Sequence, residues 1–143
     1  MRIKLFLRLH YLIQLLRKKG LSFFVLPFQI SHKICQVLIG MDFSDKVQIG
    51  KGLIIDHGQG LVVHQDVQIG NFVRLRNNVT IGLSSSDSTG APVIGDNVDV
   101  GVGSIIIGSI KIESDVTLGA LSLVNRDISA PGVYVNKRQL TKL

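Results

Sequence analysis

The stretch IGDNVDVGVGSIIIGSIKIESDVTLGALSLV, residues 94–124, carries a branched aliphatic residue at every sixth position. The members of this series are Ile94, Val100, Ile106, Ile112, Leu118 and Val124. A helix would scatter them around its surface, because six residues advance an α-helix by well over one turn. One unbroken strand also fails, because strict alternation would bury Asp96, Gly108 and Ser114 together with the aliphatic series. The period therefore predicts short strands joined by corners, stacked as the coils of a parallel β-helix.

The residues between the aliphatic positions support corners, since they are mostly Gly, Asp, Asn and Ser. These residue types tolerate left-handed backbone or bond their own main chain. The six-residue phase also runs upstream, first through Phe43, Ile49 and Ile55 and then through Val63, Ile69, Leu75 and Ile81. Eight residues separate Ile55 from Val63, so we expect the chain to bulge within residues 56–61.

A second irregularity follows Ile81. Thirteen residues separate Ile81 from Ile94, where twelve would keep the register. Residues 83–92 are polar with short side chains, so we expect them to leave the coil as a loop. Loops on a rigid scaffold often carry function.

The 143 residues suffice for one domain with its own core. Three parts are expected: a basic amphipathic helical cap (1–41), the β-helix with its loop (42–130) and a closing segment (131–143). The single cysteine, Cys35, excludes an internal disulfide framework, is expected to be buried, and favours a reducing, cytoplasmic setting.

Charge is concentrated in the first part. Residues 1–41 contain seven Lys or Arg and no Asp or Glu, whereas residues 42–143 contain nine basic and ten acidic residues. Two readings stay open: a cap whose basic side chains face water, or a cap in which residues 1–40 also contact an anionic membrane surface peripherally. A nucleic-acid surface is not expected, because no base-stacking aromatic residues accompany the charge. No segment reaches the ~18 apolar residues that a membrane span requires.

Within the cap, we expect an amphipathic helix over 3–19 that stops at Gly20, and a second helix over about 29–38 before Gly40. His10 and His32 lie in these helices and are expected on their surface.

His57 lies in the expected bulge and is the candidate for chemistry. Its neighbour Asp56 is a poor partner, because adjacent residues of a strand point to opposite faces. Asp42 lies fifteen residues earlier, close to one turn of the coil, so its carboxylate is expected on the same side. Such a pair could orient the imidazole as a general base, although a structural histidine stays open as the alternative.

Residues 42–126 resemble the hexapeptide acyltransferases, and within them the serine acetyltransferase-like branch. The segment IGKGLIIDHGQGLVV, residues 49–63, carries the resemblance most specifically, through its Asp56-His57-Gly58-Gln59-Gly60 bulge. Val79-Thr80-Ile81-Gly82, residues 100–103 and residues 118–122 follow at the expected distances.

The resemblance implies a left-handed coil, a homotrimer, and acetyl-CoA lying between neighbouring subunits. It makes His57 the general base and Asp42 the residue that orients it. The positions that match cofactor contacts are Gly82, Leu83, Val102 and Ala120, with backbone amides around Gly82 and Leu83 as candidates for stabilising the oxyanion. Lys137 and Arg138 are candidates for contacts to the CoA phosphates, with a solvated tail as the alternative.

Three departures bear on the acceptor. Ala91 stands where the serine acetyltransferases carry a second histidine, their large N-terminal helical domain is replaced by about 40 basic and apolar residues, and the familiar C-terminal step is absent. This layout is similar to the short enzymes that O-acetylate sugars of capsule, O-antigen or exopolysaccharide, whose acceptors are often lipid-linked. The main expectation is therefore a sugar O-acetyltransferase, with serine acetylation or a non-catalytic solenoid as alternatives.

A metal site is not expected. The zinc-dependent carbonic anhydrases of similar fold need three convergent histidines, and the solenoid offers only His57 and His64.

Overall fold

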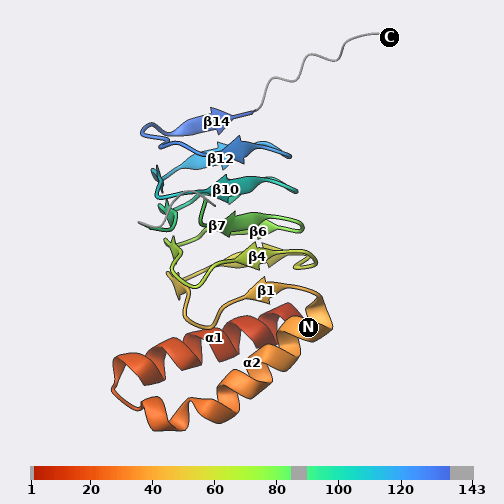
Figure 1. The fold of residues 1–143 in the computed structure, drawn as a ribbon, viewed down its shortest axis with the longest axis vertical. Coiled ribbons are helices and arrows are strands. Elements are labelled where there is room, and N and C mark those ends of the chain that lie inside the picture. Colours follow the sequence, from red (N-terminus) through yellow and green to blue (C-terminus); the bar gives the residue numbers. More distant parts are fainter. Residues whose placement is uncertain (1, 85–89, 136–143) are drawn as a thin grey trace.

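The computed structural model describes residues 2–84 and 90–135, and shows a parallel β-solenoid stacked on a pair of helices (Figure 1). The helical part comprises α1 (Arg2–Lys18), the short 3₁₀ helix η1 (Ser22–Phe24) and α2 (Leu26–Ile39). The mainly β fold with a short helical N-terminal part is as predicted.

Three parallel sheets form the solenoid walls. The first contains β1 (Asp42–Phe43), β4 (Val62–Val63), β7 (Thr80–Gly82), β10 (Ile105–Ile107) and β13 (Leu123–Val124). The second contains β2 (Gln48–Ile49), β5 (Gln68–Ile69), β8 (Val93–Ile94) and β11 (Lys111–Ile112). The third contains β3 (Ile54–Asp56), β6 (Arg74–Arg76), β9 (Asp99–Val100), β12 (Val116–Leu118) and β14 (Gly132–Tyr134).

The aliphatic series predicted from the sequence fills the interior. Ile94, Val100, Ile106, Ile112, Leu118 and Val124 are all buried, and none exposes more than 7% of its surface. The residue beside each of them in a strand points outward, as period-two alternation requires. The column of inward side chains is one continuous hydrophobic cluster that extends down to the helices.

The strand register gives the number of extra residues in each of the two irregular coils. Val62 pairs with Thr80, eighteen residues on, which is three hexapeptides. Asp42 pairs with Val62, twenty residues on, so the predicted two-residue bulge is confirmed. Thr80 pairs with Ile105, twenty-five residues on, so the coil that contains the loop has seven extra residues.

The predicted size of the second irregularity was therefore wrong. Ile81 and Ile94 lie in adjacent sheets of one coil, because they pair with Ile106 and Ile112, which are six residues apart. Periodicity alone could not distinguish two hexapeptides plus one residue from one hexapeptide plus seven.

The helices begin and end where backbone chemistry permits. Gly20 and Gly40 have left-handed φ angles of 73° and 77° and follow α1 and α2 respectively. The second helix starts at Leu26, earlier than the expected residue 29, because Pro27 falls in its first turn, where no backbone N–H is needed.

Side chains of α1 close the lower end of the solenoid. Their donors bond to backbone carbonyls of the first coil: Arg17 to Asp45, His10 to Val47, Gln14 to Ile49 and Tyr11 to Gly50. In the upper coils, the corresponding carbonyls accept from the coil below, as Ile69 does from the N–H of Gly50. The helix thus satisfies acceptors that the end of the solenoid leaves open.

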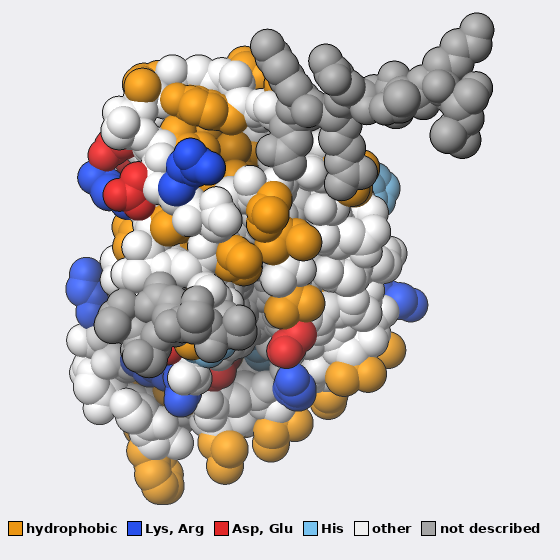
Figure 2. Space-filling view, turned by 45° about the horizontal axis from the view of Figure 1, so that its top comes forward, with side chains coloured by type: hydrophobic (Ala, Val, Ile, Leu, Met, Phe, Trp, Pro, Cys, Tyr) orange, Lys and Arg blue, Asp and Glu red, His pale blue; other side chains and the backbone are white. Residues whose placement is uncertain are grey.

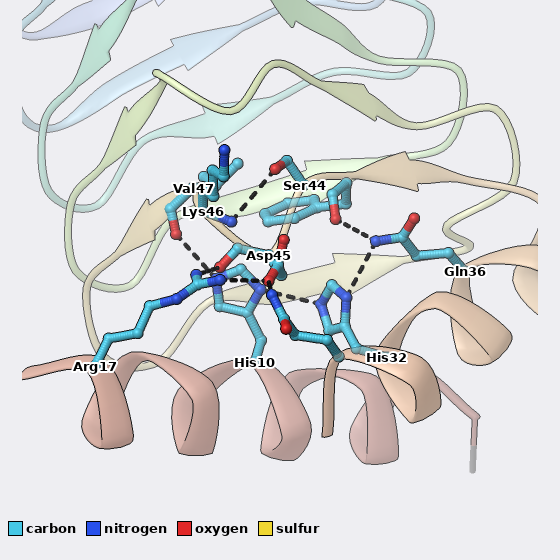
Figure 3. A network of polar contacts seen from close by, with 10 residues as sticks. His10, Arg17, His32, Gln36, Ser44, Asp45, Lys46 and Val47 are labelled. Carbon is cyan, nitrogen blue, oxygen red and sulfur yellow. Dashed lines mark hydrogen bonds and ion pairs between the residues drawn. The ribbon is translucent and has the colours of Figure 1, made fainter. Parts of the chain in front are cut away.

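His10 and His32 form part of this closure, so their expected surface position was wrong. Both are buried, with 0% and 1% of their surface exposed, and they meet between the helices and the first coil (Figure 3). The Val47 carbonyl can only accept, so His10 donates to it from Nε2 and accepts at Nδ1 from Nε2 of His32 (3.1 Å). Nδ1 of His32 in turn accepts from the amide of Gln36.

Burial keeps both rings neutral. Loss of solvation lowers the pKa of His10, and it lowers the pKa of His32 to about 4, with a further lowering from the charge on His10. Burial acts to raise the pKa of the nearby Asp45, but hydrogen bonds from Gln29 and Arg17 outweigh it and hold that pKa below its ordinary value. The prediction for Cys35 is confirmed, since this free cysteine is buried.

Candidate active site

His57 occupies the corner between the third and first sheets, directly after β3. Its φ angle is 55°, a left-handed value that is uncommon for a residue other than glycine. The ring is exposed, whereas the next residue, Gly58, is buried. A Cβ on Gly58 would approach Cγ2 of Ile39 to 3.0 Å and Sδ of Met41 to 3.2 Å, so this position favours glycine. Gly58 therefore packs the bulge against the buried side chains of Ile39 and Met41, and the preceding residue, His57, is left exposed.

Asp42 begins β1, and His57 precedes β4, the strand that pairs with β1. Both residues therefore lie at the N-terminal edge of the first sheet, as the sequence predicts. The described structure records the Asp42 carboxylate 3.8 Å from Nζ of Lys33 and no hydrogen bond to the His57 ring. The orienting role of Asp42 remains a prediction.

The predicted cofactor positions fall at two different edges. Val102 and Ala120 lie in the corners before β10 and β13, in the same stack of corners as the His57 bulge, and both are exposed. Gly82 ends β7, and Leu83 follows it with 40% of its surface exposed. Since the strands are parallel, these two lie at the C-terminal edge of the first sheet. Within one chain, the structure therefore does not bring Gly82 and Leu83 to the side of His57.

The outer face of the first sheet joins these edges and is largely apolar. Val62, Ile105 and Leu123 occupy one register column with Thr80 and have 40%, 41% and 51% of their surfaces exposed. Figure 2 shows several groups of hydrophobic side chains on the surface of the molecule. Such a column on a sheet face is typical of a contact surface.

A depression of about 700 Å³ borders the His57 bulge and is lined by Asp56 and Gln59 together with residues of α1 and α2. A larger depression, of about 920 Å³, lies between α1 and the second sheet, and none of the predicted site residues that the structure describes lines either depression. The smaller depression is the one that adjoins the bulge, through Asp56 and Gln59.

His64, the other solenoid histidine, is partly exposed and lies 3.6 Å from a carboxylate oxygen of Asp66. Within residues 2–84 and 90–135, no three His, Cys, Asp or Glu side chains converge in the way a metal site requires. The positions of Lys137 and Arg138 lie outside the described residues.

Sequence comparison finds relatives over most of this chain. It is 33% identical to a serine acetyltransferase of Synechococcus elongatus over 105 residues. This aligned region covers 73% of this chain and 43% of that protein. The chain is 38% identical over 97 residues to a serine acetyltransferase of Staphylococcus epidermidis, covering 67% of this chain and 46% of that protein. The chain thus spans just under half the length of these curated relatives. No protein-family model matches.

Solved structures give the same result. The serine acetyltransferase isoform 3 of Entamoeba histolytica, in complex with cysteine, superposes with a TM-score of 0.79 at 26% identity, over 94% of this chain and 48% of that one. The soybean serine acetyltransferase complexed with serine superposes with a TM-score of 0.78 at 29% identity, over 92% of this chain and 54% of that one. The chain has the hexapeptide-repeat acyltransferase fold, and its homologues are serine acetyltransferases.

These findings correct the acceptor predicted from the sequence. The relatives of this hexapeptide acyltransferase chain are serine acetyltransferases, so the polysaccharide branch and its lipid-linked sugar acceptor are not supported. The prediction rested on what the chain lacks, including a histidine at position 91. Ala91 instead packs against the hydrophobic core. These departures were weaker evidence than similarity along 105 residues.

Proposed function

We propose that this chain transfers the acetyl group of acetyl-CoA to the hydroxyl of L-serine. The observation that carries the proposal is an exposed histidine on a left-handed bulge, in a chain whose homologues are serine acetyltransferases. The alternative of a non-catalytic solenoid gives no reason for the two extra residues that hold the His57 ring outside the coil.

The chemistry follows from the imidazole. Neutral His57 accepts the hydroxyl proton as the oxygen attacks the thioester carbonyl of acetyl-CoA. The tetrahedral intermediate carries a negative oxygen, which backbone N–H groups would stabilise. It collapses to O-acetylserine, and the departing thiolate of CoA takes the proton from the imidazolium.

The two edges of the first sheet explain why a second subunit is part of this proposal. His57, Val102 and Ala120 lie at one edge, and Gly82 with Leu83 lies at the other. Packing the C-terminal edge of one chain against the N-terminal edge of the next would complete the site between them. A closed ring of three such contacts is the homotrimer that the resemblance implies, and the apolar outer face of the first sheet would supply contact area.

The test of catalysis is His57→Ala. We expect the turnover number with acetyl-CoA and L-serine to fall by about 10²-fold or more, with the affinity for acetyl-CoA nearly unchanged. Asp66→Ala, beside the other solenoid histidine, serves as the control and should keep full turnover. A loss of acetyl-CoA affinity with unchanged turnover would contradict the assigned role.

We also propose that the helical cap contacts an anionic membrane surface. The helices form one end of the molecule (Figure 1), and hydrophobic side chains project from that end (Figure 2). Those of η1 and α2 with more than half of their surface exposed are Phe23, Phe24, Leu26, Ile30, Ile34, Val37 and Leu38. All seven charged residues of segment 1–41 are basic, which suits anionic lipid headgroups. Among the described helices, none has the length and apolar character of a membrane span.

Co-sedimentation with vesicles tests this contact. The protein should bind vesicles that contain phosphatidylglycerol more strongly than pure phosphatidylcholine vesicles, and the double change Phe23→Ser and Phe24→Ser should weaken binding. Val133→Ser changes a side chain at the opposite end of the solenoid whose exposure (74%) lies between those of Phe23 (92%) and Phe24 (59%), and it should have no effect. Equal binding by all three proteins would rule the contact out.

A further inference from the structure

The end of α2 is bonded to the bulge that carries His57. The backbone carbonyl of Gly40, the residue that caps the helix, accepts a hydrogen bond of 2.7 Å from the N–H of Gly60. Gly58 packs so closely on the last residue of α2 that a Cβ there would lie 3.0 Å from Cγ2 of Ile39. A backbone hydrogen bond and a close apolar contact therefore hold the bulge against α2.

The residue predicted to orient His57 follows the same helix end. The N–H of Met41 donates to the carbonyl of Gln36, one turn back in α2, at 3.1 Å. The next residue, Asp42, donates its N–H to the carbonyl of Leu61, at the far end of the bulge, at 2.9 Å. Both members of the predicted catalytic pair therefore depend on the placement of the last turn of α2.

Gln36 fixes this turn to the first coil. Its side chain is buried, and Nε2 donates to the carbonyl of Phe43 at 2.5 Å and to Nδ1 of His32 at 3.1 Å (Figure 3). From His32 the chain of hydrogen bonds continues through His10 to the carbonyl of Val47. Gln36 thus links two buried imidazole rings to the helix end that holds the bulge.

This chain of hydrogen bonds cannot take up a proton without loss. A proton on Nδ1 of His10 would face the N–H of His32, and a proton on Nδ1 of His32 would face the amide N–H of Gln36. Turning the amide over would offer its oxygen to His32, but would set that oxygen against the carbonyl of Phe43. A proton on either ring therefore costs at least one hydrogen bond.

The charged groups around the rings compensate only in part for such a proton. They are Arg17 of α1, Lys33 of α2 and Asp45 of the first coil. The two cations oppose a charge on His32, and the carboxylate of Asp45 already accepts from Arg17 at 2.6 Å and from Gln29 at 2.7 Å. Burial is the largest cause of the lowered pKa of His32, and the two cations lower it further.

We propose that Gln36 and His32 position the His57 bulge through the last turn of α2, and that a proton taken up by the two buried rings releases it. The effect on catalysis rests on the proposed function, whereas the effect on the bulge does not. In the competing description the polar chain only stabilises the cap, and the bulge would respond to its loss no more than to the loss of any other hydrogen bond of the cap.

The first experiment removes the amide of Gln36. For Gln36→Leu we expect kcat with acetyl-CoA and L-serine to fall about 10-fold, because a displaced base loses its alignment, while the KM for acetyl-CoA stays within about two-fold. Gln14→Leu is the matched control. Gln14 also joins a helix to the first coil, through Nε2 and the carbonyl of Ile49 at 3.3 Å, but it bonds to the second sheet. Its loss should leave kcat within about two-fold.

Hydrogen exchange of residues 57–61 measures the bulge without a substrate. The pKa of His32 is lowered from 6.5 to about 4, so its contribution is complete above pH 6.5 and is lost as the pH falls toward 4. Between about pH 7.5 and about pH 5, the protection of the Gly60 N–H should therefore fall about 10-fold or more, after correction for intrinsic exchange. In His32→Gln the fall should be clearly smaller. His57 is present in both proteins, so its own titration cancels.

Equal kcat and equal bulge protection in Gln36→Leu and Gln14→Leu would overturn the inference while leaving serine acetylation standing. So would an unchanged pH dependence in His32→Gln, a comparison that does not require Gln36→Leu to fold. A wild-type protein that transfers no acetyl group to L-serine would overturn the proposed function, and the exchange of residues 57–61 would then decide whether α2 holds the bulge.

Discussion

The solenoid and its helical cap satisfy backbone hydrogen-bonding groups by different means. In the solenoid, each coil bonds to the next through repeated backbone hydrogen bonds, and the inward aliphatic column repeats every six residues. In the cap, individual side chains reach individual carbonyls, and a chain of neutral polar groups runs from Gln36 through His32 and His10 to Val47. The solenoid therefore depends on burial, and the cap depends in addition on the protonation and geometry of a few polar groups.

The largest change in the free energy of unfolding is expected when a side chain of the aliphatic column is shortened. Ile106 is fully buried, so Ile106→Ala should lower the free energy of unfolding by about 2–5 kcal/mol, through lost burial and the cavity that remains. Urea denaturation followed by circular dichroism measures the change. Ile54→Ala removes the same atoms from a side chain that is 42% exposed and should cost clearly less. Equal losses would mean that the column does not dominate stability.

Acid should act on the cap. The pKa of His32 is lowered from 6.5 to about 4 in the folded chain, so the unfolded chain binds a proton more readily between these values. Stability is therefore complete above pH 6.5 and is lost as the pH falls toward 4, by up to about 3 kcal/mol for His32. Thermal unfolding measured between pH 7.5 and 4 would show this slope.

His32→Gln keeps a polar side chain but removes the titration, so it should flatten the slope between pH 6.5 and 4. The variant is expected to be less stable at pH 7.5, because the chain from Gln36 to Val47 is interrupted. A slope as steep as that of the wild type would assign the acid sensitivity to other groups.

The smallest effect concerns the ion pair at the edge of the cap. Arg17 donates to the carbonyl of Asp45 and to its carboxylate, both at 2.6 Å, so Arg17→Met should cost about 1 kcal/mol. Lys33→Met is the matched control, because Lys33 lies 3.8 Å from Asp42 and both side chains are mostly exposed. It should change the free energy of unfolding by less than about 0.5 kcal/mol. Urea denaturation at low and high salt would separate the two.

The contrast also explains which features could be predicted. The six-residue period reports burial directly, so the coil, its buried column and the bulge at residues 56–61 followed from the sequence. The hydrogen bonds through which the helices close the end of the solenoid follow no such period. His10 and His32 were expected on the surface because a helical pattern with basic neighbours gives no sign that two rings are partners across 22 residues.

The candidate site divides in the same way. His57 and its bulge were predicted, since two extra residues within a regular repeat are visible in the sequence. That Gly82 and Leu83 lie at the opposite edge of the first sheet could not be seen, because the edge depends on strand direction and coil register. The ion pair of Arg74 with Asp56 was not predicted for a related reason: the two residues are eighteen apart in the sequence and meet only across neighbouring coils.

The sequence by itself determined that the chain coils, where its aliphatic residues are buried and where one histidine leaves the coil, because these features follow from local spacing and backbone preference. Only the tertiary structure decided how the end of the coil is closed, how many residues the loop adds, and which charged groups pair across neighbouring coils. Those features depend on contacts between residues far apart in the chain, and a periodic pattern does not record them.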